Sequence, residues 1–139
     1  MTRKEQRELK LRKETEFLNS IRDKPIDGKL KGEYRTTSFW KDFRNLLKKE
    51  RKTDYLTGRK LTKTWNCHHM RFDPRLYTYL DKEFFRCYNN QIHDLVHLCV
   101  TETIKNPDFM KKLTDEVNLH IELNGNKDVR DFVKEVKNG

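Results

Sequence analysis

The chain has 139 residues, of which 38% are charged and 34% hydrophobic, and its 31 basic and 22 acidic side chains give a net charge of +9. This length predicts one domain, or one small domain with an extended arm, and the low apolar content predicts a modest core with exposed charged helices. The sequence lacks the run of about 18 apolar residues that a membrane span needs and the apolar region of a signal peptide, so we expect no membrane association and a cytoplasmic location.

The first third of the chain is predicted to be helical and basic. Residues 3–23 predict a helix with a thin apolar stripe, and the glycines and proline that follow predict a linker to about residue 34. A basic helix is predicted over 38–52, where Trp40 and Phe43 belong to an apolar face at helical spacing. Residues 1–53 hold 17 basic and 9 acidic residues. This excess is typical of a polyanion-binding region, and equally of a solvated helix with mixed charges.

The middle of the chain predicts two short strands and a helix. A turn around Gly58 precedes a strand over 63–70, and a second strand is predicted over 83–88 from its aromatic content. A helix over 90–104 follows. The sequence therefore predicts an α+β fold that is mostly helical, with a ββα core over about 54–105.

The last third is predicted to be helical and nearly neutral. Asn106 and Pro107 are expected to cap a helix that ends near residue 121, and Asn124-Gly125 predicts a turn before a final helix over 127–137. These C-terminal helices, within 106–137, either complete the core or form a dimer surface, and we favour the core. We thus expect an arm and linker over 1–33 and one domain over 34–139.

Four of the five histidines fall within thirty positions. His93 and His97 are four residues apart on the predicted helix, so they share a face with Asn90, and this spacing suits two imidazoles on one divalent metal. His68 and His69 are adjacent on a predicted strand, so their side chains point to opposite faces. One of them can therefore bind metal while the other acts as a base.

The histidines are also compatible with two roles that involve no catalysis. A structural zinc site is weakened by the cysteines, because Cys67, Cys87 and Cys99 are too widely spaced for a zinc knuckle or a disulfide framework. Alternatively, the histidines are incidental to a basic helical protein that binds nucleic acid. His120 lies outside the group and is expected to be an ordinary surface residue.

The order strand, His-His, strand, Asn, helix, His resembles the ββα-metal fold of HNH endonucleases. The pattern D-Y-L-T-G, then N-x-H-H, spans residues 54–69, and an upstream S-x-W-x-x-F-R segment spans residues 38–44. The resemblance covers about 38–105 and is closest to small phage-type HNH proteins. The chain also lacks alanine entirely, which we interpret as codon bias of an AT-rich genome. A phage protein would act in the cytoplasm of its host.

The resemblance implies a metal-dependent endonuclease that hydrolyses DNA by nicking or double-strand cleavage. His68 resembles a metal ligand and His69 the general base that activates water. Asn90 resembles the residue that orients the base or ligates metal, with Asn89 as the alternative. His93 and His97 resemble the residues that complete the metal site or contact the scissile phosphate. One divalent ion per site, Mg²⁺, Mn²⁺, Ni²⁺ or Zn²⁺, is expected to stabilise the leaving group.

DNA is the expected partner, contacted mainly through its phosphate backbone. The residues expected to make these contacts are Arg44, Lys48, Arg59, Lys60, Lys63 and Arg71. We expect Trp40 to lie in the core, whereas Trp65 fits either the core or a stacking contact with a base. A rival interpretation is a non-catalytic phage factor on the same scaffold that binds DNA or a host protein. The oligomeric state stays open.

Overall fold

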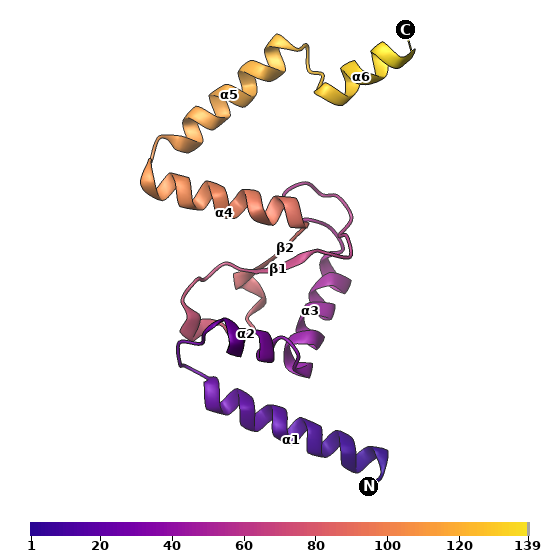
Figure 1. Cartoon of the computed structure of the whole chain (residues 1–139), viewed down its shortest axis with the longest axis vertical. Coiled ribbons are helices and arrows are strands. Elements are labelled where there is room, and N and C mark those ends of the chain that lie inside the picture. The colour runs from indigo at the N-terminus through magenta and orange to yellow at the C-terminus, as the bar shows by residue number, and fades with distance from the viewer. Residues whose placement is uncertain (139) are drawn as a thin grey trace. The chain divides into compact units, whose positions relative to one another are not determined.

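The computed structural model describes residues 1–138, which form a mostly helical α+β structure with one two-stranded antiparallel sheet (Figure 1). The elements are α1 (Arg3–Ile21), α2 (Gly28–Tyr34), α3 (Ser38–Arg51), β1 (Asn66–His69), the 3-10 turns η1 (Pro74–Leu76) and η2 (Lys82–Phe84), β2 (Phe85–Tyr88), α4 (Asn90–Lys105), α5 (Phe109–Leu123) and α6 (Val129–Asn138). The chain divides into two compact units, residues 1–93 and residues 94 onward, with the boundary inside the continuous helix α4.

Side-chain caps fix where the first three helices begin. The side chain of Thr2 accepts a hydrogen bond from the backbone of Glu5, and Thr37 caps α3 through the backbone N–H of Trp40. The predicted helices over 3–23 and 38–52 are therefore confirmed to within two residues. The linker predicted up to residue 34 is wrong in its second half, because Asp27 caps α2 by accepting from Leu30 at 2.8 Å.

The buried core lies entirely in the first unit. Tyr34 and Leu47 are fully buried at 0% exposure, and they pack with aromatic side chains of α3 and β2. The remaining core residues are Leu18, Ile21, Ile26, Trp40, Phe43, Leu61, Trp65, Phe85 and Cys87. The end of α1 and the segment after it, which lie in the stretch expected to be an arm and linker, thus supply core side chains.

Leu46 and Leu47 provide a neighbouring pair of exposed and buried leucines on α3. We expect Leu47→Ala to lower the free energy of unfolding by about 2–5 kcal/mol, because it leaves a cavity in the packed core. Leu46 is 42% exposed, so Leu46→Ala should change stability by less than about 1 kcal/mol. Urea denaturation followed by circular dichroism measures both. Equal losses in the two variants would contradict this description of the core.

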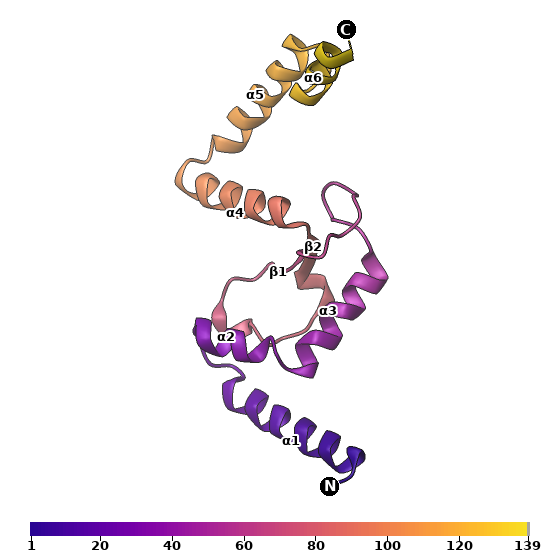
Figure 2. The same ribbon diagram turned by 45° about the vertical axis from the view of Figure 1, so that its right-hand side comes forward.

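Strands β1 and β2 form a hairpin that packs against α3, and the connection from α3 to β1 runs over residues 52–65 (Figure 2). His69 pairs with Phe85 and Cys67 with Cys87, on the face that packs into the core, while His68 pairs with Arg86 on the other face. The adjacent histidines thus point to opposite sides, as alternation in a strand requires. Both strands are shorter than predicted. The chain turns at Thr62–Trp65 before β1, and η2 occupies the residues before β2.

The second unit, as far as residue 138, contains no buried side chain. The expectation that residues 106–137 complete the core stays a prediction; within this unit, Val136 on α6 is 81% exposed. The predicted cap at Asn106-Pro107 is displaced. The Asn106 side chain accepts from the backbone of Asp108 in a turn, and α5 begins at Phe109. Among the described helices, none has both the length and the apolar character needed to cross a membrane.

Candidate metal centre

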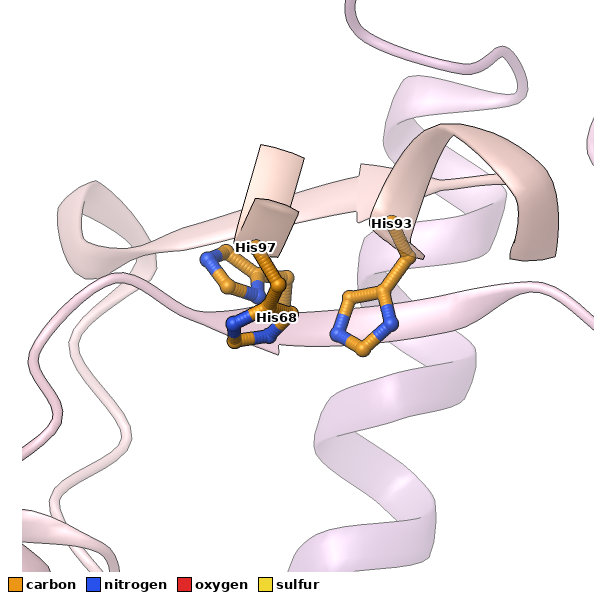
Figure 3. A group of neighbouring side chains, drawn as sticks. All are labelled: His68, His93 and His97. Carbon is orange, nitrogen blue, oxygen red and sulfur yellow. The ribbon is translucent and has the colours of Figure 1, made fainter. Parts of the chain in front are cut away.

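Three of the predicted histidines come together. His68 on β1 and His93 and His97 on α4 each offer a ring nitrogen, and these nitrogens all lie within 4.8 Å of one another. Figure 3 shows the two α4 side chains reaching toward the strand that carries His68. His93 and His97 are four residues apart on one continuous helix, which stacks them on one face. We call this group the histidine cluster.

The surroundings of His68 are aromatic and largely dry. The residue is 5% exposed, and its ring lies 5.3 Å from the ring of Tyr88 and 5.1 Å from that of His93, between centroids. Phe72 also contacts it, edge to face. His93 is half-buried and His97 is exposed, so the cluster opens to solvent on its α4 side.

The donor set of the cluster suits a divalent transition metal. Three imidazoles satisfy three positions of a tetrahedral Zn²⁺ and leave the fourth for water or substrate, the arrangement found in catalytic sites. Within the described chain no carboxylate belongs to the group, and Mg²⁺ prefers oxygen donors. Of the four metals expected from the sequence, Zn²⁺ and Ni²⁺ therefore fit these residues better than Mn²⁺ and Mg²⁺.

His69 does not belong to the cluster. Its ring stacks on Tyr77 at 4.1 Å and on Trp40 at 5.3 Å, and its Nε2 lies 3.2 Å from the Tyr77 carbonyl oxygen. Burial lowers the pKa of His69 to about 4, although the Tyr77 carbonyl opposes this shift. The ring is therefore neutral at pH 7. Because a carbonyl only accepts, Nε2 carries the hydrogen and Nδ1 is the basic nitrogen.

The two neighbouring asparagines have different roles. The Asn89 side chain accepts from the backbone N–H of Thr62 at 2.9 Å and donates to the Lys60 carbonyl at 3.1 Å. It therefore ties the loop before β1 to the start of α4. Asn90 is exposed, and its amide oxygen accepts from the Asn66 side chain at 3.1 Å. Of the two residues, Asn89 is the one fixed in place by the fold.

Asp54 is a buried carboxylate that sequence analysis did not assign a role. It is 1% exposed, and one oxygen accepts from the backbones of Leu56 and Thr57 and from the Thr57 hydroxyl. The other oxygen accepts from the backbone N–H of Asn89 at 2.7 Å. Burial raises the pKa of Asp54, but these hydrogen bonds outweigh burial and hold it below its ordinary value. Asp54 thus fixes the turn 54–58 and the residue at which α4 begins.

Several predicted DNA-contact residues have structural partners. Arg44 stacks over Trp65 at 4.2 Å and donates to its carbonyl, and Arg71 lies 3.6 Å over the ring of Phe84. Trp65 is 3% exposed, so it is a core residue like Trp40 and does not present its ring for stacking on a base. The other four, Lys48, Arg59, Lys60 and Lys63, are exposed.

Arg51 is a second structural residue that sequence analysis missed. Its guanidinium donates to the carbonyls of Phe85 at 2.7 Å and Lys82 at 2.8 Å, which fastens the end of α3 to β2. No sequence pattern indicates this contact. For Asp54 a signal exists, because an aspartate followed by Thr and Gly three and four positions later is typical of an Asx turn.

No protein-family model matches the chain, and no curated protein or solved structure matches it either.

Proposed function

We propose that the chain is a metal-dependent endonuclease of the HNH type that hydrolyses DNA. The observation that carries this proposal is the histidine cluster, in which the first residue of an adjacent His pair on a hairpin meets two histidines one turn apart on the next helix. This arrangement follows the strand–strand–helix order of ββα-metal nucleases. The basic charge of the first unit is the second support, because it suits a polyanionic substrate.

The ligands of the proposed site would be His68, His93 and His97. A divalent ion held there would supply positive charge to the phosphate and its leaving oxygen. The aromatic neighbours of His68 keep water away from its side of the cluster, which strengthens electrostatic interactions there. The open α4 side is where a phosphate group has access.

We assign the general base to His69, the second member of the pair. A base must be unprotonated before it accepts a proton from water, and burial keeps the ring of His69 neutral throughout the neutral range. The same pKa of about 4 makes this imidazole a weaker base than an exposed histidine, so the assignment rests on its place in the adjacent pair. The hydrogen bond to Tyr77 leaves Nδ1 as the accepting nitrogen. The stack with Trp40 and Tyr77 fixes the plane of the ring.

The decisive experiment is cleavage of supercoiled plasmid by the full chain with Zn²⁺, Ni²⁺, Mn²⁺, Mg²⁺ or EDTA. We expect nicking with the transition metals and none with EDTA. His69→Ala should retain metal binding but nick about 10²–10⁴-fold more slowly, the usual contribution of a general base. Gel densitometry of the nicked form measures the rates.

His69 also packs in the core, so a second variant separates packing from catalysis. His69→Phe keeps an aromatic ring in the stack and removes both nitrogens. A His69→Phe protein that has wild-type stability and still nicks at the wild-type rate would show that His69 only packs. A folded variant that binds metal but does not nick supports the assignment.

One observation favours a second candidate, a non-catalytic DNA- or host-protein-binding factor on the same scaffold. The ring of His69 lies on the core side of the hairpin, whereas His68 faces α4. A metal-loaded wild-type protein that binds plasmid without nicking it under any of these metals would establish this second function.

A further inference from the structure

A concave polar pocket lies beside the first turn of α4, within the first unit. Its volume is about 480 Å³, and its walls come from the loop before β1 and from the start of the helix. The lining residues are Thr57, Arg59, Lys60, Thr62, Thr64, Asn89, Asn90, Gln91 and Ile92. They include two cations, three hydroxyls and three amides but no carboxylate. A pocket of this composition suits an anion.

The two cations of this pocket differ from four arginines around the site. Arg44, Arg71 and Arg86 lie over aromatic rings, and Arg51 donates to two carbonyls. By contrast, the side chains of Arg59 and Lys60 form no salt bridge, hydrogen bond or cation–π contact with any residue from 1 to 138. Their charges are therefore not compensated by the fold.

The pocket is also held in a fixed relation to the histidine cluster. Asn89 hydrogen-bonds to Lys60 and Thr62 in the pocket wall, and its backbone carbonyl accepts from the N–H of His93. Asn90 in the pocket lies three residues before His93 in α4, about 4.5 Å along the helix axis, so the pocket and the cluster share the first turn of this helix.

We propose that this pocket binds a backbone phosphate of the substrate strand, adjacent to the phosphate that is cleaved at the histidine cluster. Arg59 and Lys60 would neutralise its charge, and the threonine hydroxyls and amide groups would donate hydrogen bonds. The inference rests on the proposed nuclease function and adds the position of a second phosphate. It also gives the loop over 57–64 a role in placing the strand.

The test uses the isotope-labelled full chain in EDTA, so that DNA is bound but not cut. We titrate it with a thymidine octanucleotide and, separately, with inorganic phosphate, and follow backbone amide shifts by NMR. The octanucleotide should shift the amides of Thr62, Asn90 and Gln91 in the pocket wall. Shifts confined to other surfaces would overturn the proposal. So would a pocket that responds to inorganic phosphate but not to the octanucleotide.

Variants with equal charge changes give the second readout. The double variant Arg59→Ala/Lys60→Ala should weaken octanucleotide binding at least about tenfold and reduce the slope of log affinity against log salt by about 1 to 2. Lys111→Ala/Lys112→Ala removes two exposed cations of α5 and should leave both quantities near wild type. Equal effects of the two double variants would contradict a specific pocket.

Failure of this proposal is distinguishable from failure of the nuclease function. If the wild type nicks plasmid and the Arg59→Ala/Lys60→Ala variant nicks and binds equally well, the pocket is wrong and the nuclease stands. If the octanucleotide occupies the pocket but no metal supports nicking, the pocket stands as a phosphate site and the nuclease is wrong.

Discussion

Replacing His68 by alanine should abolish metal binding and DNA cleavage together. His68 is the buried member of the three-histidine cluster, and two imidazoles of one helix provide too few ligands for tight binding. We expect the affinity for Zn²⁺ or Ni²⁺ to fall at least about 100-fold, since even residues that only orient ligands are worth about 10- to 100-fold. Competition with a chromophoric chelator measures the affinity.

Two further variants make this prediction specific. His120→Ala removes an exposed histidine of α5, whose Nδ1 lies 2.6 Å from the Glu116 carbonyl oxygen, outside the cluster. It should bind metal as the wild type does. His97→Ala replaces an exposed residue of the cluster. This variant should therefore fold even if the buried His68→Ala substitution disturbs packing. Undiminished metal affinity in His97→Ala would remove His97 from the site.

Asp54→Asn should be the most destabilising single change outside the apolar core. At pH 7 we expect a loss of about 3 kcal/mol in the free energy of unfolding, because hydrogen bonds to a buried charged group are the strong ones. Asparagine supplies one oxygen in place of two, so its NH₂ group would face an N–H donor, either that of Asn89 or those of the turn. Asp42→Asn, on the exposed face of α3, is the matched control and should be nearly neutral.

The contribution of Asp54 should also depend on pH. Its pKa in the folded protein lies below its ordinary value, so the carboxylate stabilises the fold fully above about pH 4, where the unfolded chain is also ionised. This stabilisation is lost as the pH falls through the lowered folded pKa. The stability difference between wild type and Asp54→Asn should therefore shrink in acid. A difference that is constant from pH 7 down to about pH 2 would contradict this role.

The same substitution should weaken metal binding indirectly. Asp54 holds the backbone N–H of Asn89, and the carbonyl of Asn89 accepts from the N–H of His93. Loosening this connection frees the first turn of α4 and disperses the ligands. In the proposed site, Asp54 would thus position the cluster through the backbone of Asn89.

The sequence predicted most of the fold because its main signals are local. The helix over 38–51 follows from an apolar face and a threonine cap, and the two strands and the next helix follow from composition and turns. That one histidine of the adjacent pair can meet His93 and His97 was also predictable, since alternation in a strand and helical spacing each place such residues on one face. The assignment of that role to His68 came from the family resemblance. These features can be predicted from residues that lie close together in the sequence.

The rest depends on contacts between distant segments. Helix α2 contains two glycines, and what anchors it is the burial of Tyr34, which no local pattern reveals. The stacking of His69 on Tyr77 joins residues on either side of the loop after β1. Similarly, Arg44 was predicted to face DNA but finds Trp65 across the loop that precedes β1. In each of these cases, contacts with residues distant in the sequence, and not local structural propensity, decide where the segment or side chain lies.

The adjacency of His68 and His69 has a consequence for how the metal site is encoded. A slip of one residue in strand pairing turns every side chain to the opposite face, so a slipped hairpin would still present a histidine to α4. The histidines themselves therefore do not distinguish the native pairing from this alternative. Phe85 and Cys87 fix which face of β2 packs into the core. On β1, the apolar residue of that face is Cys67, which packs against the core, whereas the slipped pairing would turn Asn66 toward the core instead. The apolar character of Cys67, rather than either imidazole, therefore favours the pairing that turns His68 toward α4 and His69 toward the core.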